Sequence, residues 1–361
     1  PKCPTAHLNK GRCLIELGNL EDALAATLKS LEINPNNPSV HMNLGVIYEE
    51  LGEIDLALSS ALKSLELKPE NPEALNNIRG FIDQLPLKRT NAEHVTRVYE
   101  LLLTRTDISH KKLTGIFLQA FLPVIHNASK SNPIVFEGNV DLGILAADWR
   151  FLKSLTLMIP PSPEAEKFLT RLRKELLSLA IKEGNIPAQL KGLTEALAAQ
   201  CFLNEYVYCT SIEEEESVEK LIKQAAQNQE GTDKFLAIIG CYKAIYKIGL
   251  SRNLINNYPT PDDISQEMII TQFKEPRVED EIKDYLINPF GTTDRISRHV
   301  QEMYEENPYP RFKYSDFTIK GLAKPICESI KKEMTKHNQC FRKELSSPNS
   351  IPRVLIAGCG T

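Results

Sequence analysis

The chain has 361 residues, a formal charge of −4 and 42% hydrophobic residues, a composition typical of a globular protein with two or three domains. The slightly acidic balance gives no electrostatic case for a nucleic-acid partner. No apolar run approaches the roughly 20 residues of a membrane-spanning helix, so no membrane partner is expected. The eight cysteines include no Cys-x-x-Cys pair. We therefore expect no metal site and reduced thiols, as in a cytoplasmic protein.

A repeat opens the chain, because residues 4–37 align with residues 38–71 at an offset of 34. Small residues recur where two antiparallel helices would touch, and a proline ends each second helix, since it disfavours the helical state of the residue before it. The matched residues are Gly11 and Gly45, Leu17-Gly18 and Leu51-Gly52, Ala23-Leu24 and Ala57-Leu58, Pro35 and Pro69, and Asn37-Pro38 and Asn71-Pro72. The pattern resembles the tetratricopeptide repeat and predicts helices over 6–16, 20–33, 39–51 and 54–67.

A third unit begins with Pro72 to Ile78, loses the pattern after Gly80 and breaks at Pro86. Two full repeats are fewer than such a stack usually needs. Either further repeats precede this chain or the following helices cap the stack, and the two are compatible.

The repeats imply a protein or peptide partner, bound on their concave face. The candidate contacts are polar residues of the first helix of each unit: His7, Lys10, His41, Asn43 and Asn76. The alternative is that these side chains are only solvated or touch the middle region.

Residues 87 to about 257 show no repeat and no alternation typical of strands, and an all-helical middle domain is predicted over 87–290. Ser162-Pro163 is a helix start, and Ser211 to Glu214 fits a capping box. Core helices are expected over 193–208 and 235–250, and the single tryptophan, Trp149, is expected in the core. A helix from Thr260 is expected to end at Lys274-Glu275-Pro276.

The apolar run Val354 to Ala357 leads directly into Gly358-Cys359-Gly360-Thr361. An apolar run that breaks into closely spaced glycines predicts a buried parallel strand followed by a tight, ligand-binding loop. Upstream, Tyr304 to Phe312 forms a proline-rich turn with aromatic residues on both sides, either a local core or a lid over a cofactor.

Together these residues resemble the entry to a class I S-adenosylmethionine-dependent methyltransferase domain. The similarity is to bacterial proteins that join tetratricopeptide repeats, a helical middle region and that domain. Ala198 to Val207 and Phe273 to Pro276 also resemble parts of that family. The resemblance implies that Gly358 and Gly360 hold the amino-acid part of S-adenosylmethionine. The flanking contacts would come from the backbone of Ala357, Cys359 and Thr361.

The fold expected is mainly α, with tetratricopeptide repeats over 1–86, a helical middle domain over 87–290, and the start of a Rossmann-like methyltransferase domain over 291–361. The acidic residue that holds the cofactor's ribose is expected beyond Thr361. The chain is thus expected to end within its first catalytic motif. Its catalytic residues cannot be identified from this sequence, and the chain is expected to be inactive by itself.

Two alternatives stay open. The chain is a non-enzymatic adaptor that binds a protein or peptide through its repeats, or the terminal strand belongs to a nicotinamide- or flavin-dependent enzyme. A third loop glycine at Gly-x-Gly-x-x-Gly spacing would favour the nicotinamide- or flavin-dependent enzyme, because that spacing is typical of dinucleotide-binding loops.

Overall fold

The computed structural model describes residues 3–82, 85, 90–136, 138–227, 233–249, 255–283 and 299. These residues are mainly helical and contain no strand, in agreement with the expected mainly α fold. They form two compact units that divide between Val98 and Tyr99. The boundaries expected after residues 86 and 290 lie outside the described residues. No helix in the described ranges is both long and apolar enough to cross a bilayer.

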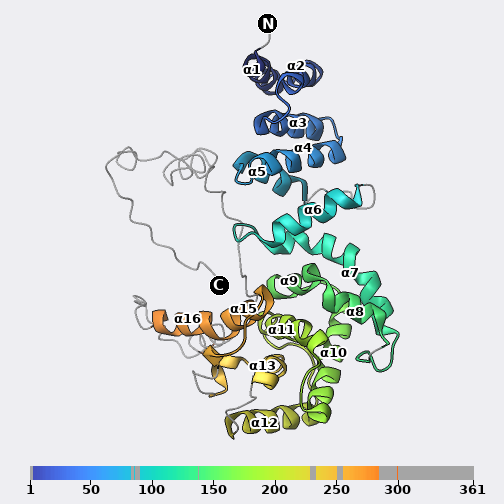
Figure 1. The fold of residues 1–361 in the computed structure, drawn as a ribbon, viewed down its shortest axis with the longest axis vertical. Coiled ribbons are helices and arrows are strands. Elements are labelled where there is room, and N and C mark those ends of the chain that lie inside the picture. Colours follow the sequence, from blue (N-terminus) through green and yellow to red (C-terminus); the bar gives the residue numbers. More distant parts are fainter. Residues whose placement is uncertain are drawn as a thin grey trace. The chain divides into compact units, whose positions relative to one another are not determined.

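Unit 1 is a stack of helix pairs (Figure 1). Its helices are α1 (Pro4–Glu16), α2 (Leu20–Ile33), α3 (Pro38–Glu50), α4 (Ile54–Leu67), α5 (Pro72–Ile82) and the first part of α6 (Ala92–Leu103). The four predicted repeat helices are confirmed to within two residues at each end. Helix α5 is the first helix of the third repeat, and it packs against α3 and α4.

The two repeats end their first helix in the same way. Gly18 and Gly52 adopt left-handed backbone angles, with φ of 75° and 78°. The N–H of Asn19 then donates to the carbonyl of Leu14 at 2.9 Å, and the same bond recurs one repeat later at 2.8 Å. This is the hydrogen-bond pattern of a Schellman motif, which needs a residue without Cβ at the left-handed position. The glycine therefore fixes the sharp turn that lays the second helix back on the first.

A buried serine ties each second helix to the start of the first. The hydroxyl of Ser30 donates to the carbonyl of Pro4, and that of Ser64 donates to the carbonyl of Pro38, both at 2.8 Å. Ser64 differs in one respect, because it also accepts a hydrogen bond from the amide of the buried Asn71 at 2.8 Å. Both repeats therefore have the hydrogen bond from the serine hydroxyl to the proline carbonyl, and the second repeat adds the bond from Asn71.

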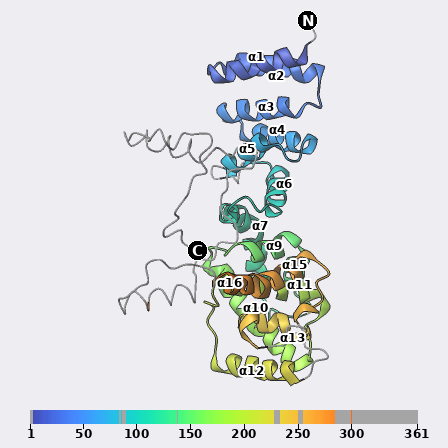
Figure 2. The ribbon, with the colours of Figure 1, turned by 90° about the vertical axis from the view of Figure 1, so that its left-hand side faces the viewer.

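Unit 2 is built around one buried helix, α11 (Ala188–Leu203), in which every residue from Leu193 onward is buried. It contacts α8, α9, α10, α13 and α15, and Figure 2 shows α10, α13 and α15 beside it. The other elements are η1 (His110–Leu113), α7 (Thr114–Ser129), α8 (Val140–Ala147), α9 (Trp149–Leu157), α10 (Pro163–Glu183), α12 (Ile212–Gln227), α13 (Asp233–Gly240), η2 (Ile245–Lys247), α15 (Asp263–Ile269), the π-turn η3 (Ile270–Lys274) and α16 (Glu275–Lys283).

The predicted helix starts in unit 2 are confirmed. The Ser162 hydroxyl accepts from the N–H of Ala165 at 3.3 Å, at the first turn of α10. At α12, the N–H of Ser211 donates to the carboxylate of Glu214, and the N–H of Glu214 donates to the hydroxyl of Ser211. This is the reciprocal pair of a capping box.

The ends of the two core helices and the burial of Trp149 were predicted wrongly. The core helices end at Leu203 and Gly240, not near 208 and 250. Gly240 ends α13 where Ala198, Ile245 and Gln272 come so close that a Cβ would lie 3.2–3.3 Å from each. Trp149 is 45% exposed, because it occupies the first position of α9, before the turn that packs on the core.

The helix that begins near residue 260 also does not end at Pro276. The chain passes from α15 through η3 into α16 without a loop. Pro276 stands in the first turn of α16, directly after the π-turn, a position where a missing N–H costs little. The apparent stop signal therefore marks a change of helix type.

We predict that Ser64→Ala destabilises its repeat more than Ser30→Ala does. Ser64→Ala deprives both the Pro38 carbonyl and the buried Asn71 amide of a partner, and Ser30→Ala affects only the Pro4 carbonyl. The expected losses are about 2–3 and about 1 kcal/mol. Amide hydrogen exchange in α4 and α2 measures each locally. Equal losses would show that the Asn71 bond contributes nothing.

Candidate functional site

The polar residues predicted to bind a partner do not share one face. On α3, His41 and Asn43 are two residues apart, which places them about 200° apart around the helix. The ring Nε2 of His41 lies 2.8 Å from the carbonyl of Pro35, in the turn before its own helix. Lys10 and Asn76 are exposed, and they occupy different positions of the repeat from His41 and Asn43.

One asparagine recurs at the same position of each repeat. Asn9, Asn43 and Asn77 follow one another at intervals of 34 residues, so they occupy the same position on α1, α3 and α5. Because α3 contacts both α1 and α5, the three asparagines form a row across neighbouring helices, which we call the asparagine ladder. The signal was present in the sequence. Extending the repeat alignment into the third unit finds it, but only the structure gives its burial.

The ladder contains unpaired amides. Asn43 is 3% exposed, and its Nδ2 is buried without a hydrogen-bond partner. The Nδ2 of Asn77 is in the same state, and Asn9 is exposed. Leaving a buried amide donor unpaired costs about 1–3 kcal/mol. This cost occurs at the same position of two successive repeats, and stability alone does not explain it.

The ladder lies away from the partner helix within each repeat. Gly45, two residues after Asn43, faces α4, where its nearest atom is the carbonyl of Ala57 at 3.5 Å. Asn43 is therefore on the opposite side of α3. Met42 and Val46 flank it and are half-buried, so this side of α3 reaches solvent. We call the side of α1, α3 and α5 that carries the ladder the ladder face.

A half-buried carboxylate lies on the side of α3 that carries Met42 and Gly45. Glu49 follows Met42 by seven residues, which returns it to the same side of α3. Burial, and secondly the charge of Glu50, raise the pKa of Glu49. A cationic group placed against this carboxylate would stabilise it.

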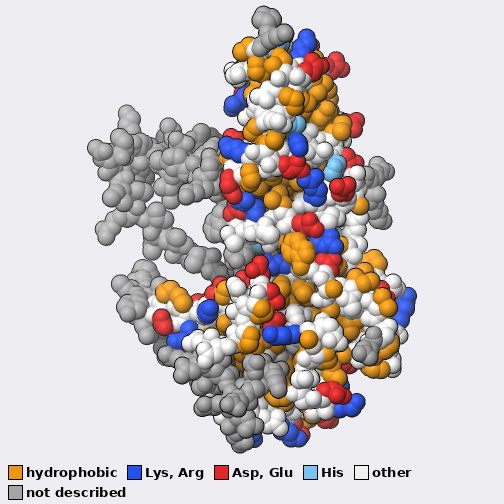
Figure 3. Space-filling model, in the orientation of Figure 1, with side chains coloured by type: hydrophobic (Ala, Val, Ile, Leu, Met, Phe, Trp, Pro, Cys, Tyr) orange, Lys and Arg blue, Asp and Glu red, His pale blue; other side chains and the backbone are white. Residues whose placement is uncertain are grey.

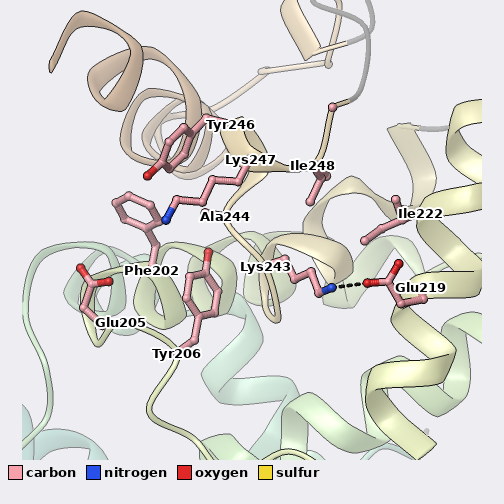
Figure 4. A pocket seen from close by; sticks show the side chains of 11 residues that line it. Phe202, Glu205, Tyr206, Glu219, Ile222, Lys243, Ala244, Tyr246, Lys247 and Ile248 are labelled. Atoms are coloured by element: carbon pink, nitrogen blue, oxygen red, sulfur yellow. Dashed lines mark hydrogen bonds and ion pairs between the residues drawn. The ribbon is translucent and has the colours of Figure 1, made fainter. Parts of the chain in front are cut away.

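Unit 2 holds a cavity of about 490 Å³ beside the end of α11 (Figure 4). Phe202 and Tyr206 form one wall, and Tyr246 and Lys247 form another. The Phe202 ring lies edge-on to both tyrosine rings, with centroids 6.4 Å apart in each case. The Lys247 Nζ lies 5.6 Å from the centre of the Tyr246 ring. Such ring faces bind planar or cationic groups.

The backbone at this cavity is strained. Glu205 and Tyr206 both adopt left-handed angles, with φ of 54° and 57°, although neither is a glycine. This conformation costs roughly 1–2 kcal/mol per residue. The N–H of Tyr206 returns to the carbonyl of Cys201 at 2.8 Å, so the turn directly caps α11. The strain turns the Tyr206 side chain back toward the core, where burial raises its pKa well above the ordinary value and keeps the hydroxyl protonated.

Gln272 joins the segments around the cavity. It is fully buried within the π-turn η3. Its Nε2 donates to the carbonyls of Ala198 at 2.6 Å and Gly240 at 2.9 Å. Its Oε1 accepts from the hydroxyl of Tyr206 at 3.2 Å and from the N–H of Ile245 at 3.3 Å. The two segments that carried the family resemblance in the middle region, residues 198–207 and 273–276, thus meet at this side chain or next to it.

A buried arginine secures the chain beyond the strained turn. Arg173 is fully buried on α10, and its Nη2 donates to the carbonyl of Cys209 at 2.8 Å and to the hydroxyl of Thr210 at 3.0 Å. Its guanidinium lies 4.2 Å from the centre of the Tyr242 ring. A cation stacked on an aromatic ring recovers part of the hydration it loses on burial. Arg173 therefore connects α10 to the segment before α12.

The predicted cofactor-binding residues Ala357, Gly358, Cys359, Gly360 and Thr361 lie outside the described residues, as does Tyr304 to Phe312. Within the described ranges, no group of three or more His, Cys, Asp or Glu side chains is arranged to hold a metal ion. Figure 3 shows acidic and basic side chains interspersed over the described part of the face in view.

Comparison with protein families supports the repeats. Residues 11–52 match the family described as TPR repeat, and residues 38–71 match the family described as Tetratricopeptide repeat. No curated protein and no solved structure matches the chain. Tetratricopeptide repeats generally mediate interactions between proteins, so the family matches support a protein-interaction module within residues 11–71.

We predict that Gln272→Leu destabilises unit 2 by about 3–5 kcal/mol, because two buried carbonyls, the Tyr206 hydroxyl and the Ile245 N–H lose their partner. Gln224→Leu, on the exposed side of α12, is the matched control and should change stability by less than about 0.5 kcal/mol. Urea unfolding followed by tyrosine and tryptophan fluorescence measures both. Equal effects of the two variants would contradict the importance of the Gln272 hydrogen bonds.

Proposed function

We propose that this protein binds an extended segment of a partner protein on the ladder face of its repeats. The family matches support a protein-binding module. The ladder face is the part of that module that we propose as the binding site. The single observation that carries the proposal is the pair of buried, unpaired amides at equivalent positions of α3 and α5. Stacked repeats present a continuous surface of this kind to a linear partner.

The proposal predicts that a peptide selected from a random display library on the full chain competes for the ladder face. Val46→Arg places a long charged side chain beside Asn43 and should weaken binding by at least about tenfold, a loss of about 1.4 kcal/mol. Leu28→Arg is the matched control, because Leu28 is 37% exposed on α2, outside the ladder face.

Fluorescence anisotropy of the labelled peptide measures both variants. Binding that survives Val46→Arg, or that falls equally with Leu28→Arg, would remove the ladder face as the binding site.

We also propose that the chain carries the beginning of an S-adenosylmethionine-dependent methyltransferase domain. The support is the Gly358-Cys359-Gly360-Thr361 motif after its apolar run, together with the meeting of residues 198–207 and 273–276 around Gln272. In this proposal the backbone of residues 357–361 holds the amino-acid part of the cofactor, and the repeats bring a protein partner to the enzyme. A cytoplasmic location belongs to the same proposal.

Calorimetric titration with S-adenosylmethionine tests the enzyme proposal. We expect micromolar binding to a version extended along the reading frame past Thr361, loss of that binding in Gly358→Val, and no binding to the 361-residue chain. The valine fills the space that the cofactor would need beside the loop. No binding to the extended protein would remove the methyltransferase assignment. Binding to the 361-residue chain would place the cofactor site elsewhere.

A further inference from the structure

We propose that the cavity beside the end of α11 is a small-molecule site that binds a planar aromatic ring carrying an anionic group. The ring lies against Phe202, Tyr206 and Tyr246 in this proposal, and the anionic group lies against the ammonium of Lys247. The inference concerns unit 2 alone. It does not depend on the partner proposed for the repeats or on the methyltransferase proposal.

The cavity has the size and the lining of a ligand site. Its volume of about 490 Å³ lies within the range of about 300–1,000 Å³ that is typical of pockets for small molecules. Such pockets are mostly apolar, with a few polar groups that orient the ligand. The apolar lining residues here are three aromatic and three aliphatic side chains: Phe202, Tyr206, Tyr246, Ile222, Ala244 and Ile248.

The aromatic wall on α11 is fixed before any ligand arrives. Phe202 is buried at the end of the helix, and the Tyr206 hydroxyl donates to Gln272 at 3.2 Å. The left-handed backbone at Glu205 and Tyr206 is of the kind that is found preferentially at ligand-binding sites, where surrounding bonds hold it. Side chains that are already ordered lose little entropy on binding. This wall therefore favours a rigid, planar ligand, which also has little entropy to lose.

The charges at the cavity favour an anionic group on that ligand. Lys243 and Glu219 form an ion pair and so neutralise each other, and Glu205 has an interaction of its own. Lys247 is exposed, and its ammonium lies 5.6 Å from the centre of the uncharged Tyr246 ring. Among the residues that the structure describes, no carboxylate forms an ion pair with Lys247. A ligand carboxylate would provide that partner.

The direction of the Lys247 side chain agrees with this assignment. In Figure 4 it extends from η2 toward the Phe202 and Tyr246 rings, so its charge lies beside the aromatic surface. Aromatic faces also attract cations. Lys247 already places a cation next to the Tyr246 ring, however, and it would repel a second one.

The test uses the 361-residue chain and three probes that share one ring system and differ in charge. They are 2-naphthoate, which is an anion, naphthalene-2-carboxamide, which is neutral, and naphthalene-2-methylammonium, which is a cation. Ligand-observed NMR titration measures their dissociation constants, and about 0.1–1 mM is expected for molecules of this size. We expect 2-naphthoate to bind about fivefold more tightly than the carboxamide, and the cation to bind most weakly. No binding of 2-naphthoate, or equal affinity for all three probes, would overturn the proposal.

A variant locates the binding of the anion. Lys247→Met keeps most of the side-chain length and removes the charge, so the preference for 2-naphthoate over the carboxamide should disappear. Affinity for the carboxamide should stay unchanged, which shows that the cavity is intact. Lys220→Met, on the exposed side of α12 and outside the cavity lining, is the matched control and should keep the preference. Loss of the preference in both variants, or in neither, would overturn the role of Lys247.

A fourth probe tests the aromatic walls. Decahydro-2-naphthoate carries the same carboxylate on a saturated, non-planar ring system. It cannot stack on Phe202, Tyr206 or Tyr246, so it should bind at least about threefold more weakly than 2-naphthoate. Equal or tighter binding of the saturated acid would show that the cavity does not recognise a planar ring, and would overturn that part of the proposal.

Discussion

Helices packed side by side remove water from the groups between them, and every polar group trapped there needs a partner. This constraint governs both units. In unit 1 the glycine turns bond the last carbonyls of α1 and α3, and Ser30 and Ser64 bond the carbonyls at the helix starts. In unit 2 the side chain of Gln272 bonds four groups, through both its amide nitrogen and its oxygen. Most of the named polar side chains are explained once their partners are known.

The exceptions then become informative. Asn43 and Asn77 each bury an amide nitrogen that the repeats do not satisfy, at a position repeated every 34 residues. A single unpaired group can be a local defect, but an unpaired group that recurs every 34 residues is a property of the repeat. The helices that carry these residues touch in sequence, so the defect lies along a line and not at a point. In the proposed function, the partner segment lies along this line.

The sequence predicted best what depends on neighbouring residues. The repeat helices, the Ser162 cap and the Ser211–Glu214 capping box follow from short-range patterns, and the structure confirms them. Prediction from the sequence was wrong where residues far away in the chain determine where a helix ends. Nothing near Leu203 indicates that α11 ends there, because the turn at Tyr206 is held by Gln272, 66 residues later. The prediction that Trp149 lies in the core was also wrong, although its cause is local: Trp149 is the first residue of a helix capped by Asp148, and it is 45% exposed.

The π-turn has a consequence for how unit 2 tolerates insertions and deletions. A π-turn holds one residue more per hydrogen-bonded ring than an α-helix, so α15 and α16 are joined through one surplus residue. Deleting any single residue of 270–274 would restore regular α-helical bonding, and by that local measure it would be harmless. A deletion in the regular α-helix on either side would instead rotate everything beyond it by about 100°. The π-turn absorbs its surplus residue locally, so α15 and α16 keep their own packing while Gln272 holds both α11 and α13. Of all one-residue deletions in this part of unit 2, one within 270–274 that spares Gln272 should therefore cost the least stability.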